Sequence, residues 1–448
     1  MPAPISPVLA RVVGPGLPLA FRACDGSSVE PPGAVATIEV VDRRALNHLA
    51  TAPGELGLAR AYVSGALDLH GDVFETLMLL SGGTVGALGW AERLEVLRSL
   101  GPGVLRPVPP PPEEVRPGPW WGLRHSLGRD SRAISHHYDV SNRFYEWLLG
   151  PTMAYTCAVY PHPEASLEEA QTEKVDLVCR KLGLRPGQRL LDVGCGWGTM
   201  VRHAAEHYGV SVVGVTLSRE QAEWGQRRLV EAGLDDRAEI RHQDYRNVAE
   251  SGFDAISSIG LTEHIGARNL AGYARFLTSR LRPRGRLLNH CITRPTTTGP
   301  VAHRRGFIER YVFPDGELEG IGTIVTALQD AGLEVRHEEN LREHYARTCA
   351  AWGSNLEDHW DEAVAEVGEG RARVWRLYLA GSRLGFVQRR IELHQVLAVR
   401  TDAGEAGMPL RAEFARLAQP AELVRPAAPA DAAAPARAAR AALAAEVD

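Results

Sequence analysis

Apolar and polar residues alternate with two distinct spacings over residues 165–293. Short apolar runs bounded by glycine or polar residues predict strands over 189–193, 210–215, 238–242, 253–259 and 285–292. Between them, apolar residues at helical spacing predict helices over 167–182, 199–208, 219–232 and 270–281. Strands separated by helices of this length predict an α/β fold with a mostly parallel sheet and helices on both faces.

A smaller α+β domain is predicted for the N-terminal residues 1–100. The apolar run at 36–41 predicts a strand, a helix starts after Asp42, and 54–68 predicts a short helix followed by a turn. Prolines then recur between Gly101 and Gly118 and exclude both a helix and a central strand. Residues 101–130 are therefore interpreted as an interdomain linker.

The second domain is expected over 131–400, where an insertion and helices rich in Trp and Arg follow residue 300. Residues 401–448 are dominated by Ala and Pro, with Phe414 their one aromatic residue, and are predicted to be a disordered tail.

The composition is that of a soluble globular protein. The chain has 448 residues, is 44% hydrophobic and 23% charged, and carries a net charge of -5, so no basic field indicates a nucleic-acid partner. Lys174 and Lys181 are the only lysines beside 48 arginines, a bias typical of a high-GC bacterial genome. Six scattered cysteines, no apolar run of the roughly 20 residues needed to span a bilayer, and no signal-peptide pattern indicate a reduced cytoplasmic protein.

The segment 190–198 (Leu-Leu-Asp-Val-Gly-Cys-Gly-Trp-Gly) carries the strongest motif. A predicted strand runs into glycines at alternate positions, which let the backbone turn sharply and approach a ligand. This spacing resembles the first motif of class I S-adenosylmethionine (SAM)-dependent methyltransferases, although such loops also occur as plain turns. Thr216, Ser218 and Gln221 follow the next strand, where polar groups suit the ribose and methionine parts of the cofactor. Ser218 is also expected to cap the following helix.

A third strand is followed by Asp244 and Tyr245. The carboxylate could accept from an adenine amino group and the ring could stack on the base, although a simple turn explains both residues equally well.

Ordered motifs at 136–139, 155–158, 191–198, 214–221, 243–245, 263–266 and Tyr345 then extend the pattern. With them, residues 130–400 resemble the cyclopropane fatty acid synthase family, which includes the mycolic acid cyclopropane synthases. Residues 54–72 are similar to that family's N-terminal lipid-binding portion. The resemblance implies a Rossmann-like class I methyltransferase domain, SAM as cofactor and an unsaturated phospholipid acyl chain as substrate.

The chemistry of this family explains its residue choices. A carbon–carbon double bond is a weak nucleophile, so a dry pocket must position it against the sulfonium methyl, and the resulting carbocation then needs a base. Family members are understood to hold bicarbonate as that base. The ligands carried over by the resemblance are Cys157, Glu263, His290, the backbone at Ile292, and Tyr345. The cofactor contacts carried over are Tyr155, Thr156, Gly194, Gly196, Thr216, Leu217, Gln221, Asp244 and Tyr245, and no metal is implied.

Each anion ligand has a structural alternative when taken alone. Cys157 could be a small buried apolar residue, His290 a core histidine, and Glu263 a helix cap. The combined pattern favours the functional interpretation.

Glu146 departs from the small or apolar residue of cyclopropane-forming relatives. A carboxylate near the cofactor lid could alter how the cation is quenched, while the alternative is a solvated helix position. The chain also resembles the methyltransferases of the tuberculostearic acid pathway, which form a 10-methylene chain from oleoyl phospholipid for a separate reductase. We therefore expect this product in preference to a cyclopropane.

Membrane contact is expected at the inner face of the membrane. Residues 371–400 carry seven arginines and one acid among apolar residues, so they could lie on anionic phospholipid or form a packing helix with a solvated face. Trp120 and Trp121 are a second candidate anchor. A homodimer is a candidate assembly, and the sequence does not fix the oligomeric state. Two other functions are weighed. The absent basic field and the missing amino-methylation motif argue against an RNA or small-molecule methyltransferase, and the intact glycine loop argues against a lipid-binding protein without activity.

Overall fold

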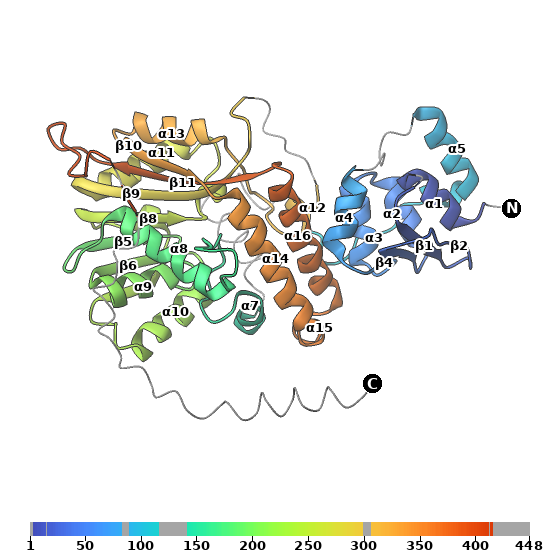
Figure 1. Ribbon diagram of the computed structural model, residues 1–448, viewed down its shortest axis with the longest axis horizontal. Coiled ribbons are helices and arrows are strands. Elements are labelled where there is room, and N and C mark those ends of the chain that lie inside the picture. The colour runs from blue at the N-terminus through green and yellow to red at the C-terminus, as the bar shows by residue number, and fades with distance from the viewer. Residues whose placement is uncertain are drawn as a thin grey trace, which may run out of the picture. The chain divides into compact units, whose positions relative to one another are not determined.

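A seven-stranded sheet lies at the centre of the larger part of the chain (Figure 1), within the residues that the computed structural model describes, 3–14, 16–82, 89–115, 141–298, 306–411 and 413–414. Its order is β10-β11-β9-β8-β5-β6-β7. The four pairings from β9 to β7 are parallel, and β11 pairs antiparallel with both β9 and β10. The strands are β5 (Arg189–Val193), β6 (Ser211–Thr216), β7 (Ala238–His242), β8 (Phe253–Ile259), β9 (Leu281–Thr293), β10 (Glu334–Asn340) and β11 (Glu392–Val399).

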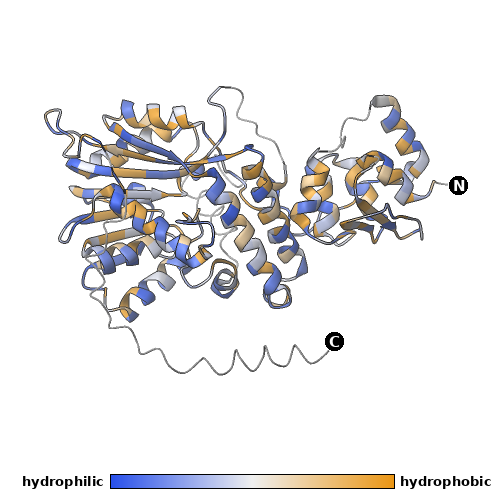
Figure 2. Ribbon diagram, in the orientation of Figure 1, coloured by the Kyte–Doolittle hydropathy of each residue, from blue (hydrophilic) through white to orange (hydrophobic). Residues whose placement is uncertain are grey.

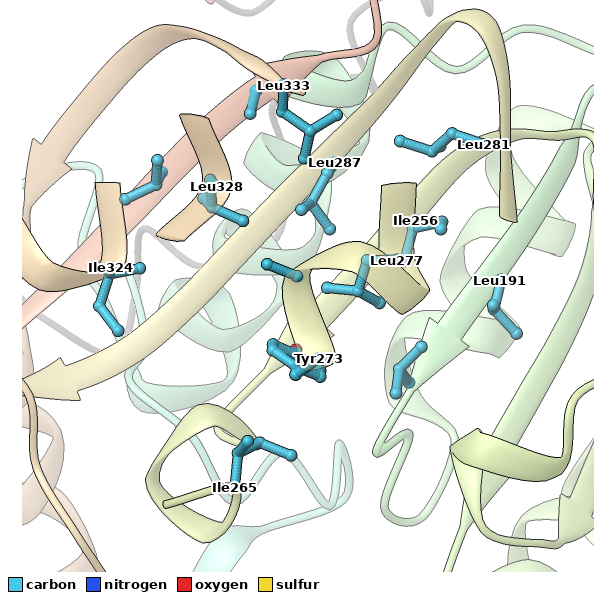
Figure 3. Packing of buried hydrophobic residues seen from close by; sticks show 14 of the residues in the cluster. Leu191, Ile256, Ile265, Tyr273, Leu277, Leu281, Leu287, Ile324, Leu328 and Leu333 are labelled. Carbon is cyan, nitrogen blue, oxygen red and sulfur yellow. The ribbon is translucent and has the colours of Figure 1, made fainter. Parts of the chain in front are cut away.

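Helices cover both faces of this sheet. On one face, α8 packs against α9 and reaches β8 and β9, and α10 packs against β6 and β7. On the other face, α11 and α13 bury a continuous apolar cluster with residues of five strands (Figure 3). The helices are α8 (Leu167–Leu182), α9 (Thr199–Tyr208), α10 (Arg219–Glu231), α11 (Leu270–Arg280) and α13 (Ile321–Asp330). This arrangement confirms the predicted α/β class.

A group of helices packs together beside the sheet. Helix α14 contacts α16, α15 and α7, and it also reaches β11. These helices are α7 (Asn142–Leu149), α14 (Arg342–Asp358), α15 (Trp360–Val367) and α16 (Glu369–Val387). The short helix α12 (Phe307–Tyr311) precedes α14 in the chain and contacts the N-terminal region. The group carries many of the aromatic side chains that the site uses.

The N-terminal residues form a second, smaller sheet of order β2-β1-β3-β4. Apolar residues of its strands and helices, such as Phe21, Ile38 and Tyr62, are buried. Figure 2 shows hydrophobic positions along these elements in orange. Its strands are β1 (Leu19–Ala23), β2 (Ser28–Val29), β3 (Ala36–Val40) and β4 (Leu67–His70). Its helices are α1 (Ile5–Val13), α2 (Arg44–Thr51), α3 (Glu55–Val63), α4 (Val73–Gly82), α5 (Trp90–Leu100) and the short η1 (Pro102–Leu105).

The proline-rich segment after η1 is extended and partly buried. The side chain of Glu114 is fully buried and accepts two hydrogen bonds from Arg60 on α3, at 2.6 and 2.7 Å. Glu114 also accepts from Tyr311 on α12, and the Val115 amide donates to the Arg310 carbonyl. The segment thus ties α3 to α12. Residues 3–411 belong to one compact unit, and the predicted domain boundaries stay a prediction.

Most predicted elements between 165 and 280 lie where the sequence places them. Five elements have the predicted bounds, α10 and α11 each end one residue earlier than predicted, and β6 is shifted by one residue at both ends. Strand β9 is longer than predicted because it begins at Leu281, four residues before Gly285, with a register shift against β8. Strands β1, β2, β10 and β11 were not predicted, and residues 67–68, predicted as a turn, belong to β4.

The basic stretch 371–400 is not a surface amphipathic element. Helix α16 buries Trp375, Leu377, Tyr378, Leu379, Leu384 and Phe386 within the protein, and 392–399 form the fully buried strand β11. Several arginines form ion pairs, such as Arg373 with Asp68 and Arg376 with Glu357. The packing interpretation is therefore correct here, because the apolar side chains needed to enter a membrane face inward. Among the described residues, no helix is both long and apolar enough to cross a bilayer.

Candidate functional site

The glycine loop after β5 forms one wall of a pocket at the carboxyl ends of the parallel strands. Gly194 and Gly198 have φ values of 78° and 82°, in the left-handed region that favours glycine. A Cβ on Gly198 would lie 2.2 Å from Ile240 Cδ1, so the loop also needs glycine to pack against β7. The pocket is lined by Gly194, Gly196, Val215, Thr216, Leu217, Gln221, Gln243, Asp244, Tyr245, Arg246, Gly260, Leu261, His264 and Ile265. It brings together seven of the nine predicted cofactor contacts.

The polar residues after β6 form a preorganised turn. Thr216 donates to the Gln221 side chain at 2.9 Å, and the Ser218 hydroxyl accepts from the Gln221 amide at 3.2 Å. Ser218 is thus the N-cap of α10, as predicted. The side chains of Thr216 and Gln221 are held at the wall of the pocket without a ligand.

Asp244 and Tyr245 occupy the third strand end. The Asp244 carboxylate forms a two-oxygen pair with the guanidinium of Arg246, at 2.8 and 2.7 Å. A bound adenine amino group would share this carboxylate with Arg246. The Tyr245 ring packs edge-on against Tyr273 and Phe276, which fixes its orientation in the wall.

Tyr155 and Thr156 approach the pocket from the segment after α7. The Thr156 side chain contacts Gly260, where an added Cβ would lie 3.2 Å from it. The Tyr155 hydroxyl donates to Tyr378 at 3.2 Å, and its ring contacts Tyr145, Trp352 and Trp375. Tyr145 in turn packs on Trp197 of the glycine loop. An aromatic cluster therefore continues from the glycine loop into the helical group.

Glu263 lies buried in the turn after β8. Its Oε1 accepts from the Ile292 amide at 2.6 Å, and its Oε2 is buried without a hydrogen-bond partner in the described part of the chain. Burial raises the pKa of this carboxyl to about 7. The Ile292 amide, assigned to the anion by resemblance, is thus already used to orient Glu263.

His290 is fully buried on the neighbouring strand β9. Its Nδ1 accepts from the side-chain amide of Gln395 at 3.1 Å, and its Nε2 is buried without a partner among the described residues. Burial, together with the positive charges of Lys174 and Lys181, holds its pKa well below the usual value, so the imidazole is neutral. Two orphaned polar atoms, one on Glu263 and one on His290, therefore stand at the ends of adjacent strands.

Cys157 and Tyr345 complete the predicted anion set. Burial raises the pKa of the Cys157 thiol well above its usual value, and this neutral thiol contacts the Ala158 and Leu341 carbonyl groups. Tyr345, one turn along α14 from Leu341, stacks on Phe386 and has a burial-raised pKa. Tyr345 lies within electrostatic range of both Cys157 and Glu263.

Glu146 does not share this environment. Its side chain is exposed on α7, whereas its neighbours Phe144 and Tyr145 are buried. This exposure fits the solvated helix position, and the role of Glu146 in quenching the cation stays a prediction. The motif at 136–139 and the pair Trp120–Trp121 lie outside the described residues.

Sequence reasoning missed several residues of the site. Gly260, Leu261 and Arg246 line the pocket, and Lys181 and Gln395 support His290. Gly260 follows β8 as Gly194 follows β5, a parallel that could have indicated it. No local pattern indicated Gln395, because its strand was not predicted.

Comparison with known proteins decides the family. The model of the mycolic acid cyclopropane synthetase family matches residues 125–396. The chain belongs to this family. It is 54% identical to a probable fatty acid methyltransferase of Mycobacterium tuberculosis over 405 residues, covering 88% of this chain and 94% of the relative. It is 40% identical to a probable fatty acid methyltransferase of Pseudomonas putida over 402 residues, covering 89% and 96%.

Solved structures of the mycolic acid cyclopropane synthetase family show the same fold. A cyclopropane synthase of Mycobacterium tuberculosis superposes with a TM-score of 0.58 at 33% identity, covering 60% of this chain and 98% of that structure. A mycolic acid cyclopropane synthase complexed with S-adenosylhomocysteine and CTAB gives a TM-score of 0.57 at 31% identity, covering 60% and 98%. The chain is thus a SAM-dependent methyltransferase of a family that modifies fatty acids, and the pocket beside the glycine loop is its candidate cofactor site.

Proposed function

We propose that this enzyme transfers the SAM methyl group to the double bond of an oleoyl chain on phospholipid and forms a 10-methylene acyl chain. The observation that carries the acyl-chain part of the proposal is the orphaned pair, Glu263 Oε2 and His290 Nε2, beside the cofactor pocket. Buried polar atoms are normally hydrogen-bonded, so a pair without partners indicates a polar ligand.

Bicarbonate fits this donor and acceptor set. The neutral His290 offers an N–H, and an ionised Glu263 offers an oxygen to a hydroxyl group. A bound bicarbonate would supply the base that removes a proton from the transferred methyl group. Cys157 stays a neutral thiol and so does not repel an anion.

The aromatic cluster fits the cationic part of the reaction. Attack of the double bond breaks the carbon–sulfur bond and leaves a carbocation on the acyl chain. Tyr345 and Tyr378 lie within electrostatic range of Glu263, and Tyr155 donates to Tyr378. Aromatic rings near the reacting carbon would stabilise positive charge and exclude water.

Two products are compatible with this site. A hydride shift before loss of the methyl proton gives an exocyclic methylene, and direct loss closes a cyclopropane. The methylene product is supported by similarity: relatives named fatty acid methyltransferases are 54% and 40% identical, whereas a cyclopropane mycolic acid synthase is 34% identical over 58% of the chain. A methylene product needs a reductase to become a methyl branch, so an enzyme of that class is the proposed downstream partner. The phospholipid substrate is proposed to come from the membrane surface.

The test incubates the purified enzyme with dioleoyl phosphatidylglycerol vesicles and SAM carrying a carbon-13 methyl group. Both products gain the same mass, so NMR of the recovered acyl chains decides between them. Exocyclic methylene signals are expected. Cyclopropane signals would contradict the product, and an unaltered lipid would contradict the function.

Replacement of Glu263 tests the site. Glu263→Gln is expected to slow turnover by roughly 10²-fold, because the amide cannot accept from and orient the base as the carboxylate does. The affinity for SAM, measured by calorimetry, is expected to change less than about twofold. The matched control is Glu366→Gln, an exposed position on α15, which should match the wild type. Equal losses of turnover and SAM affinity would contradict the role of Glu263.

A further inference from the structure

A buried chain of hydrogen bonds leads from α8 to His290. Lys181 Nζ donates to Gln395 Oε1 at 2.7 Å and to Glu339 Oε2 at 2.5 Å. An ammonium group can only donate, so it requires the oxygen of the Gln395 amide on its side. The amide nitrogen of Gln395 therefore faces His290.

This orientation determines where the imidazole proton lies. The amide nitrogen donates to His290 Nδ1 at 3.1 Å, so Nδ1 carries a lone pair. A neutral imidazole then has its proton on Nε2, which is the buried ring nitrogen without a hydrogen-bond partner among the described residues. Gln395 is completely buried, so its amide is held between Lys181 and His290 away from bulk solvent.

The use of lysine points to the same role. Lys174 and Lys181 are the only lysines of a chain with 48 arginines, and both are buried on α8, seven residues apart and thus on one face. A compact ammonium fits beside a single amide oxygen, whereas a planar guanidinium presents a wide fork of donors.

We propose that Lys181 and Gln395 are positioning residues, which fix His290 as its Nε2–H tautomer so that it donates to an anion held beside Glu263. The identity of the anion rests on the proposed function, whereas the tautomer does not. At metal sites, a hydrogen-bond partner on one ring nitrogen of a histidine fixes the tautomer that binds the metal, and here the same arrangement would serve an anion.

The first experiment needs no substitution. Nitrogen-15 NMR of histidine-labelled enzyme, free of SAM and bicarbonate, reports which ring nitrogen carries the proton. The His290 signals are assigned by their loss in His290→Asn. A protonated Nε2 and an unprotonated Nδ1 are expected, and a protonated Nδ1 would overturn the proposal.

The second experiment changes the orienting group. In Gln395→Glu the carboxylate can still pair with Lys181 but must accept from Nδ1, so Nδ1 is expected to become protonated. Bicarbonate binding, measured by calorimetry with sodium bicarbonate, is expected to weaken about tenfold or more, with SAM affinity within about twofold of the wild type. Protonation of Nδ1 without weaker bicarbonate binding would overturn the positioning role.

Asn340→Asp is the matched control. Asn340 contacts His394, the histidine that precedes Gln395 on β11, at 3.0 Å and pairs with it across β10 and β11. This variant also replaces an amide by a carboxylate beside a buried histidine, yet it should leave the His290 signals and bicarbonate binding unchanged. A loss equal to that of Gln395→Glu would overturn the proposal. A wild-type enzyme that binds no bicarbonate would instead contradict the proposed anion, while the Nδ1 measurement still decides the tautomer.

Discussion

At the residue scale, the protonation of Glu263 links the site to stability. The carboxyl has a pKa of about 7 in the folded chain and an ordinary value of 4.5, so the folded state binds more protons between these two pH values. The free energy of unfolding therefore falls as pH rises through this window, by about 3 kcal/mol in total. Burial of the Glu263 carboxyl lowers the free energy of unfolding at neutral pH, so we attribute its presence at this position to function and not to packing.

Glu263→Gln should remove this pH dependence. The amide does not ionise, so the variant is expected to gain about 3 kcal/mol relative to the wild type between about pH 5 and about pH 8. Urea unfolding in bicarbonate-free buffer at both pH values measures the difference. An equal pH dependence of the two proteins would show that Glu263 is not the group responsible.

The residues of the candidate site that belong to local sequence motifs were predictable from the sequence. Gly194, Thr216 and Asp244 follow strands of one parallel sheet, so their strand ends meet at one edge whatever the details of packing. Gln395 lies 105 residues from His290 and reaches it only across the pairing of β9 and β11. For Glu146 the sequence left two interpretations open, a solvated helix position and a role in quenching the cation, and its exposed side chain fits the first.

At the element scale, strand β11 shows why part of the sheet was missed. All eight of its residues are buried, so it lacks the alternation of a half-exposed strand, and it follows the basic helix α16 after a short turn. Strand β10 is rich in charges because it lies at the edge of the sheet, where charged side chains are common. Both strands are defined by antiparallel pairing, β11 with β9 and β10 with β11, which a local pattern does not contain.

Two helical glycines should respond oppositely to the same substitution. Gly225 on α10 has no room for a Cβ, which would lie 2.8 Å from the Trp197 carbonyl oxygen in the glycine loop. Gly272 on α11 is exposed, with no atom within 4 Å of an added Cβ. Gly225→Ala is expected to destabilise by about 1–3 kcal/mol and to weaken SAM binding. Gly272→Ala is expected to stabilise by about 0.5–1 kcal/mol.

Thermal unfolding of the two glycine variants, with SAM titration of each, checks this pair. The two variants are expected to differ in the sign of the change in melting temperature, although both substitutions raise helix propensity equally. If Gly225→Ala were as stable as Gly272→Ala, the close approach of α10 to the glycine loop would be wrong.

At the scale of the whole molecule, the proline-rich segment is more than a spacer. Its prolines correctly excluded a helix after η1, but nothing in the local sequence predicted that Glu114 would be buried against α3 and α12. Charged residues are rarely buried unless they are paired. The partners of Glu114, Arg60 and Tyr311, are distant in sequence and reach it only in the folded chain. This contact joins the N-terminal sheet region to the helix that precedes Phe313, whose ring contacts His264 in the wall of the cofactor pocket.

A double-mutant cycle on Arg60 and Glu114 tests how strongly this contact holds the molecule together. Each single change to Leu removes the closest partner of a buried or nearly buried charge, because the Glu114 side chain is fully buried and that of Arg60 is 17% exposed. Arg310 stays 3.6 Å from Glu114 when Arg60 is replaced, so the loss for Arg60→Leu is expected at the lower end of about 3–5 kcal/mol in the free energy of unfolding and that for Glu114→Leu at the upper end. The double variant should recover most of one loss, since it removes both charges of the close pair and leaves the Tyr311 hydroxyl and the partly exposed Arg310 without Glu114. Urea unfolding of the four proteins gives the coupling, and simple addition of the two losses would mean that the pair does not interact.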